Sequence, residues 1–384
     1  MSGWRSNPWI PGILSAVLLV VLIVLWAQDD GSESDDAGPP ASPGDRPPSA
    51  LGWRQVDLGA MSVTSVAPSW TGSAPGVTVA GSRDGEVAML DYSTADGEVA
   101  PEFLDSDRPG RGVGTVESDA IASVMTIADG DQEGDSWWLG ESGWWQSFAA
   151  PRTSAGDPAP QAVVAPQEED GYLGAVGIDD QPDTPTLAAW YDVGHWQRID
   201  DVTMPLPRDP VPDDTAGGIV AVADEVTLYA AVQDAEGVDV LRIDAYGMGR
   251  RTSWRPLPLP IELDRVTSTT QWDLGVWFAG RVTDQPALVY LGAGEPARAV
   301  ELPDVRLDPE HPEVEILTDL IGTPLALAVQ TETGPEIWVR RNREWSRFPA
   351  PPGRVQDGQL VKRVVYLVVD GELYTGRLPK GQQG

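Results

Sequence analysis

Residues 76–104 read GVTVAGSRDGEVAMLDYSTADGEVAPEFL and show most clearly how this chain folds. An apolar strand rich in Val, Ala and Gly is followed by a turn, a second apolar strand, a second turn and a third, shorter strand. Short β-branched and aromatic runs bounded by Gly, Asp and Pro are typical of antiparallel strands joined by hairpins. No sustained helical stripe of apolar residues follows residue 50. We therefore expect an all-β class.

The same unit recurs at intervals of roughly 45 residues, which is within the range of propeller blades. Its last strand often begins with Trp and ends with Pro, and it is the easiest part to align. Copies of this strand are WWQSFAAP (144–151), HWQRIDDV (195–202), SWRPLPLP (253–260), ARAVELP (297–303) and WSRFPAPP (345–352). The repeat predicts a β-propeller over residues 51–379, followed by a short tail, residues 380–384.

The final unit lacks this outer strand, because VVYLVVD and GELYTGRLP, residues 364–379, supply only the strands before it. A Trp-led strand without its own unit stands at the beginning, in GWRQVDLG, residues 52–59. Joining the two ends would close the ring and remove exposed sheet edges. We expect seven blades closed by the N-terminal strand, with six or eight left open by the irregular segments 151–170 and 205–217.

Two adjacent tryptophan pairs stand out in DSWWLGESGWWQSFAAP, residues 135–151. WWLG and WWQSF are predicted to pair as strands of one blade around a tight turn. Side chains alternate along a strand, so each pair directs one ring to either face, where large rings pack between blades. The alternative is a platform on which a ligand stacks.

The N-terminal region contains an uncharged apolar run, IPGILSAVLLVVLIVLWA, residues 10–27. As a helix it would be about 27 Å long, close to the thickness of a bilayer core. Trp9 and Trp26 lie at its ends, and acidic residues follow it. We expect a transmembrane helix that leaves residues 1–9 in the cytoplasm and the remainder outside; a cleaved signal peptide is the alternative. Residues 28–50, rich in Asp, Ser, Pro and Gly, are predicted to be a disordered linker.

Composition excludes several functions. A formal net charge of −33 argues against nucleic-acid binding, because the chain has no positive surface to displace phosphate counterions. The absence of cysteine excludes disulfides, thiolate catalysis and a lipid-modified cysteine. His195 and His311 are the only histidines and stand alone in expected loops, which argues against a Ser-His-Asp hydrolase or a multi-histidine metal site.

DGEVAMLDYSTADGEVAPEF, residues 84–103, resembles the repeat of the quinoprotein-like propellers. GVDVLRIDAYGMGRRTSWR, residues 237–255, is similar to it more loosely, with Leu241, Asp244 and Trp254 in the expected places. The family contains quinone-dependent dehydrogenases and non-catalytic scaffolds such as the lipoprotein of the outer-membrane assembly machinery. Its dehydrogenases typically carry a vicinal cysteine pair over the cofactor. Because this chain has no cysteine, the resemblance implies the scaffold branch and no cofactor.

A calcium site is one interpretation of ADGDQEGDS, residues 128–136. Asp129, Asp131 and Glu133 alternate ahead of a glycine, as oxygen ligands do at the beginning of calcium loops. The pattern is incomplete, because Glu141 comes one residue after the twelfth position of such a loop. A solvated acidic hairpin is the alternative.

The basic cluster RRNREWSRF, residues 340–348, contains Arg340, Arg341, Arg343 and Arg347. We interpret it as a solvated or salt-bridged hairpin edge, with an anion site as the alternative. The function expected from these features is a membrane-anchored, extracytoplasmic scaffold that binds a protein or a cell-envelope polymer. A propeller glycoside hydrolase or lyase, with two carboxylates at the central channel, is the alternative.

Overall fold

The computed structural model describes part of the chain between residues 51 and 379, and every element in it is a β strand. No helix in this part is long and apolar enough to cross a membrane, and the expected transmembrane segment 10–27 lies outside the described residues. The described residues are 51–69, 76–84, 86–95, 97–98, 102–103, 117–118, 123–128, 134–139, 145–148, 161–164, 174–179, 186–192, 196–198, 204–205, 219–224, 227–234, 237–244, 253–272, 275–292, 296–317 and 324–379.

Among these residues the strands form seven antiparallel sheets. Sheet β2–β6 contains β2 (Met61–Ser69), β3 (Gly76–Arg83), β4 (Glu86–Ser93), β5 (Gly97–Glu98) and β6 (Glu102–Phe103). Sheet β7–β10 contains β7 (Glu117–Ser118), β8 (Ser123–Ala128), β9 (Gly134–Leu139) and β10 (Trp145–Phe148). Sheet β11–β15 contains β11 (Gln161–Val164), β12 (Gly174–Asp179), β13 (Thr186–Asp192), β14 (Trp196–Arg198) and β15 (Met204–Pro205).

The later sheets have the same strand order. Sheet β16–β19 contains β16 (Ile219–Asp224), β17 (Thr227–Asp234), β18 (Gly237–Asp244) and β19 (Arg255–Pro256). Sheet β20–β23 contains β20 (Arg265–Trp272), β21 (Gly275–Val282), β22 (Gln285–Gly292) and β23 (Arg298–Ala299). Sheet β24–β27 contains β24 (Val314–Ile316), β25 (Ala326–Thr331), β26 (Gly334–Arg341) and β27 (Glu344–Pro349). The last sheet, here called the joined sheet, contains β28 (Val355–Val361), β29 (Val364–Val369), β30 (Glu372–Arg377) and β1 (Arg54–Gln55).

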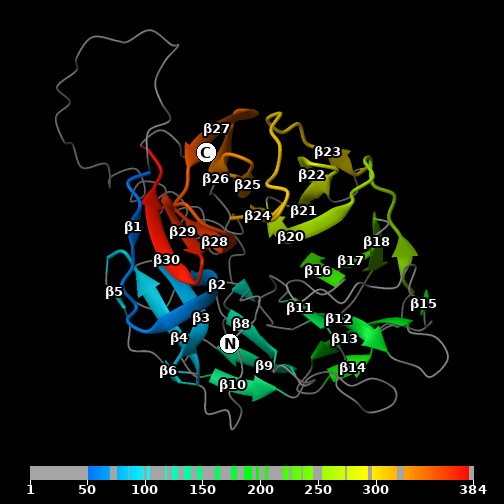
Figure 1. Ribbon diagram of the computed structural model, residues 1–384. Coiled ribbons are helices and arrows are strands. Elements are labelled where there is room, and N and C mark those ends of the chain that lie inside the picture. Colours follow the sequence, from blue (N-terminus) through cyan, green and yellow to red (C-terminus); the bar gives the residue numbers. More distant parts are fainter. Residues whose placement is uncertain are drawn as a thin grey trace, which may run out of the picture. The chain divides into compact units, whose positions relative to one another are not determined.

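In the joined sheet, the N-terminal strand lies beside the last strand of the chain (Figure 1). Arg54 is paired with Thr375, and Gln55 with Tyr374. The indole N–H of Trp53 donates a 2.8 Å hydrogen bond to the carbonyl of Pro349, which anchors the N-terminal strand to the neighbouring sheet.

Each sheet begins with a strand that the three-strand sequence unit did not include. These first strands, here called the inner strands, are β2, β7, β11, β16, β20, β24 and β28. Inner strands of neighbouring sheets contact one another: β11 with β16, β16 with β20, β20 with β24, β24 with β28, β28 with β2, and β2 with β7. The strands that the sequence predicted are therefore the second, third and fourth of each sheet.

Apolar side chains fill the spaces between neighbouring sheets, and aromatic rings meet there. Tyr229 of β17 lies edge-on to Phe278 of β21 at 6.5 Å, and Tyr92 of β4 lies edge-on to Tyr366 of β29 at 6.3 Å. Such contacts are the expected use of large rings between sheets. The pairing of WWLG with WWQSF is confirmed in β9 and β10, whose side chains lie outside the described part.

A β-bulge bends three of the inner strands at the same point. The register shifts between Val63 and Ser65 in β2 and between Val266 and Ser268 in β20. In β28 the shift follows Val355. The bulged backbone of β20 comes so close to β21 that a Cβ atom on Gly280 would lie 1.9 Å from the Arg265 carbonyl oxygen. Glycine at this position is thus required by the bulge.

Candidate functional site

The bulges place a polar residue at an equivalent position in three inner strands. Ser65, Ser268 and Asp357 each follow directly after the bulged residue of their strand. The neighbouring inner strand β24 contributes Glu315. These four residues are the polar groups from which we build the candidate site.

Side-chain hydrogen bonds join β20 to β24. The Ser268 hydroxyl donates to Glu315 Oε1 at 2.7 Å and accepts the backbone N–H of Ile316 at 3.1 Å. The preceding hydroxyl, that of Thr267, donates to the Val314 carbonyl at 2.7 Å. A serine and a threonine therefore hold together two inner strands that belong to different sheets.

Asp357 makes the corresponding connection between β28 and β2. Its Oδ2 accepts the backbone N–H of Val66 at 2.8 Å, and its Oδ1 accepts that of Gly358 at 2.7 Å. Both carboxylate oxygens are thereby engaged with backbone N–H groups. Hydrogen bonds of this kind to a charged acceptor are stronger than those between neutral groups.

The two carboxyl groups influence each other's ionisation. Burial raises the pKa of Asp357 to about 7, although the N–H groups of Val66 and Gly358 act in the opposite direction. Burial is also the main cause that raises the pKa of Glu315 well above its usual range, followed by the negative charge of Asp357. Both side chains keep part of their surface exposed. The negative charge of ionised Asp357 opposes the ionisation of Glu315.

A third carboxylate of this region is neutralised by an arginine. Glu313 accepts two hydrogen bonds from the guanidinium of Arg354. In the remaining pair, burial favours the protonated form of both Glu315 and Asp357, and Asp357 is partly ionised near neutral pH. Within the described residues, no group of three or more acidic or histidine side chains is arranged to hold a metal ion.

The acidic residues and histidines that the sequence analysis considered as site residues are not among the four polar groups of this candidate site. Asp129, Asp131, Glu133 and His195 lie outside the described residues, so the predicted calcium loop stays a prediction. His311 lies in the loop before β24, as expected. Its backbone N–H donates to Asp308 Oδ1 at 3.3 Å.

The four arginines of the hairpin β26–β27 lie in different surroundings. Arg347 forms a two-pronged ion pair with Glu336, with hydrogen bonds of 2.7 and 2.8 Å, which confirms the expected salt-bridged edge for this residue. Arg340 instead lies over the ring of Trp345, at 5.8 Å from the ring centroid. Arg341 and Arg343 are exposed.

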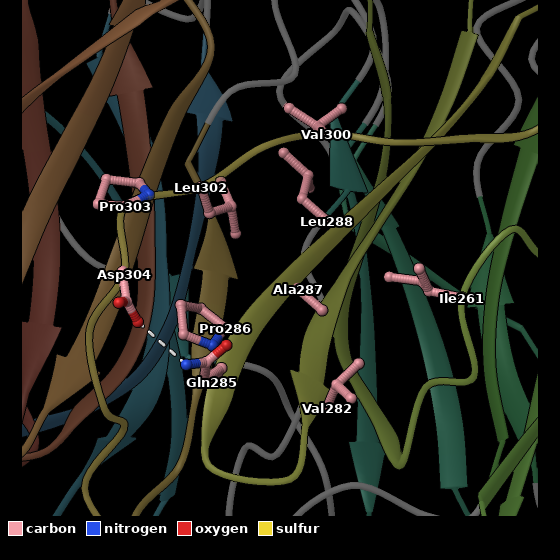
Figure 2. A pocket seen from close by; sticks show the side chains of 10 residues that line it. All are labelled: Ile261, Val282, Gln285, Pro286, Ala287, Leu288, Val300, Leu302, Pro303 and Asp304. Carbon is pink, nitrogen blue, oxygen red and sulfur yellow. Dashed lines mark hydrogen bonds between the residues drawn. The ribbon is translucent and has the colours of Figure 1, made fainter.

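A groove of about 400 Å³ lies on the outer part of sheet β20–β23. Figure 2 shows its apolar wall, with Leu288 and Val300 among the side chains, and a polar edge where Gln285 donates to Asp304 Oδ1 at 3.0 Å. Its ten lining residues are Ile261, Val282, Gln285, Pro286, Ala287, Leu288, Val300, Leu302, Pro303 and Asp304. Most of them are partly exposed.

Sequence reasoning missed the inner strands and, with them, Ser268, Glu315 and Asp357. A signal for two of these strands was nevertheless present, because the tripeptide Val-Thr-Ser occurs at residues 63–65 and again at 266–268. Both copies coincide with a bulge. No comparable signal separates the two acids from the 59 acidic residues of the chain.

Comparison with known proteins identifies the fold. No family model matches the chain, and no curated protein does. Among solved structures, BBS1N in complex with ARL6DN is similar, at 11% identity over 86% of this chain and 98% of that one, with a TM-score of 0.51. BamB from Moraxella catarrhalis matches at 14% identity over 82% and 85%, with a TM-score of 0.45. An acylaminoacyl peptidase from Pyrococcus horikoshii matches at 9% identity over 80% of this chain and 49% of its own, with a TM-score of 0.52. The fold is that of a β-propeller.

Proposed function

We propose that this protein is a membrane-anchored, extracytoplasmic β-propeller that binds a protein or a cell-envelope polymer as a scaffold, without catalysis of its own. In this proposal segment 10–27 is the anchor and residues 28–50 give the propeller reach from the membrane. The propeller has seven blades, one for each sheet, and the joined sheet closes it. This closure is supported by the pairing of β1 with β30.

The hydrogen bonds of Asp357 are the observation that carries this proposal. A catalytic carboxyl pair needs oxygens directed at the substrate, one to protonate the leaving group and one to attack or to activate water. Both oxygens of Asp357 instead hold backbone N–H groups, and Glu315 holds Ser268. These contacts support a structural role for the two acids. The structurally similar BBS1N was solved in complex with ARL6DN.

A single screen tests the scaffold. The full chain, extracted in detergent, is incubated with cell-envelope glycans and with a membrane-protein extract, and both binding and bond cleavage are measured. We expect retention of a glycan or protein without cleavage. Glycan turnover that disappears in Asp357→Asn and Glu315→Gln would refute the scaffold.

The alternative is a glycoside hydrolase or lyase. One observation favours it: the pKa values of Asp357 and Glu315 are both raised by burial, and a raised pKa is what a general acid needs near neutral pH. The same two variants separate the possibilities, because a structural pair alters stability and leaves no turnover to lose.

The anchor is tested separately. We expect mass spectrometry of the mature protein to find the N-terminus intact, and an impermeant label on whole cells to reach the propeller. A mature N-terminus near Gln28 would replace the anchor by a cleaved signal peptide and leave export unchanged.

A further inference from the structure

Two arginines lie on aromatic rings at the outer boundary between sheets β20–β23 and β24–β27. The guanidinium of Arg298 lies 4.5 Å from the centroid of the Tyr290 ring, and that of Arg340 lies 5.8 Å from the centroid of Trp345. The indole of Trp345 donates a 2.9 Å hydrogen bond to the carbonyl of Glu301, in the segment that follows β23. Both rings also pack against the same apolar cluster. The two cations are therefore placed by one rigid aromatic framework.

A third arginine occupies the adjoining hairpin turn at a conformational cost. Asn342 and Arg343 have φ angles of 49° and 72°, as in a type I′ turn. The second position of such a turn favours glycine, because a side chain there is strained. Arg343 thus adds a positive charge at a position where glycine would be more stable.

These three arginines make no ion pair within the described part of the chain, although the protein carries a net charge of −33. Glu301 and Glu344 are exposed and near in sequence, and neither is paired with them. Burial lowers the pKa of Arg340, and the positive charges of Arg298 and Arg343 lower it further. The three cations therefore repel one another, and among the described residues no carboxylate forms an ion pair with any of them.

We propose that Arg298, Arg340 and Arg343 form a binding site for the oxyanion groups of an anionic polymer. Guanidinium groups match the planar geometry of phosphate and carboxylate oxygens and donate two hydrogen bonds to each. The site is open and lies on outer strands, which suits a chain passing over the surface better than an enclosed small molecule. This inference rests on the proposed binding role and specifies the chemistry of the ligand.

The test measures retention of defined polymers by the full chain in detergent. The probes are inorganic polyphosphate, polygalacturonate, poly-glutamate and neutral dextran, each at low and high salt. We expect polyphosphate or polygalacturonate to bind and dextran not to, with affinity falling steeply as salt is raised. Which of the two binds identifies phosphate or sugar carboxylate as the source of the oxyanion. Stronger binding of poly-glutamate than of either would overturn the proposal in favour of an acidic protein segment.

Variants locate the site. Arg298→Ala combined with Arg340→Ala should weaken binding at least tenfold, whereas Arg341→Ala, on the opposite face of β26, should change it less than twofold. Arg343→Gly is the sharpest variant, because relief of backbone strain should raise the melting temperature while the affinity falls. Wild-type affinity in both Arg343→Gly and the double variant would overturn the site.

Failure of this inference is distinct from failure of the proposed function. A protein that retains no polyanion yet captures a protein partner would still be a scaffold, and the arginine site would be wrong. Cleavage of a bound polymer would refute the scaffold and leave the arginine site standing.

Discussion

Replacing Asp357 by asparagine tests whether the inner-strand carboxyl pair makes the stability of the propeller depend on pH. Burial raises the pKa of Asp357 from 3.8 to about 7. An acid with a raised folded pKa stabilises the fold fully below its unfolded pKa, and this contribution is lost as the pH rises through the folded pKa. Stability should therefore fall between pH 4 and pH 8.

The size of this loss follows from the shift. A pKa shift of one unit corresponds to about 1.4 kcal/mol, so the shift of about three units sets an upper limit of about 4 kcal/mol on the stability lost. Because Asp357 keeps part of its surface exposed, solvent screening reduces the expected loss to about 2 kcal/mol. The charge of Asp357 also raises the pKa of Glu315. Removing this charge lowers the pKa of Glu315 and so further reduces the dependence of stability on pH.

The assay is urea unfolding at pH 4.5 and pH 8, followed by tryptophan fluorescence. Asparagine offers one acceptor oxygen in place of two, so Asp357→Asn should be about 1 kcal/mol less stable than the wild type at pH 4.5, where the Asp357 carboxyl is protonated. Between pH 4.5 and pH 8, the free energy of unfolding should fall by about 2 kcal/mol less in Asp357→Asn than in the wild type. At pH 8 the variant should therefore be about 1 kcal/mol more stable than the wild type. Glu310→Gln, which removes an exposed charge, is the control and should keep the wild-type dependence. The same pH dependence in Asp357→Asn and wild type would refute the coupling of this carboxyl to folding.

Three further predictions concern the joined ends, the bulges and the acidic turn. Trp53→Ala should lower the free energy of unfolding by about 2 kcal/mol or more, because the ring packs on Gly376 and its N–H holds Pro349; an unchanged melting temperature would contradict the joined sheet. Gly280→Ala should abolish stable folding or lower the melting temperature sharply, because its Cβ atom would meet the Arg265 carbonyl at 1.9 Å. Wild-type yield and melting temperature in this variant would contradict the close approach of β20 to β21 at the bulge. Millimolar calcium should leave the melting temperature unchanged relative to chelator, as expected of a solvated hairpin at residues 128–136; a rise of several degrees would instead support the calcium loop.

The sequence predicted the strands that are regular and apolar. GVTVAGS and EVAMLDYS became β3 and β4, and GWRQVDLG supplied β1 beside β30. The inner strands escaped because a bulge breaks their alternation and because polar side chains there bond to a neighbouring sheet. VQDGQLV, which became β28, reads as a polar loop for this reason.

The acids of the candidate site could not be predicted for a related reason. Asp357 differs from the other acidic residues of the chain only in its surroundings. Its burial and its bond to Val66 depend on the packing of β28 against β2, far away in sequence. The aromatic contacts of Arg298 and Arg340 likewise arise where two sheets meet.

The pairing of β1 with β30 also sets the moment at which this protein can finish folding. Residue 54 leaves the ribosome early and must wait for residue 375, its partner in the joined sheet. Until the last strands are synthesised, β1 has no partner and its backbone edge stays unpaired. A chain that is truncated or clipped near its C-terminus therefore exposes a sheet edge and apolar side chains to proteases and chaperones. The joined sheet is therefore complete only after both β1 and β30 have been synthesised.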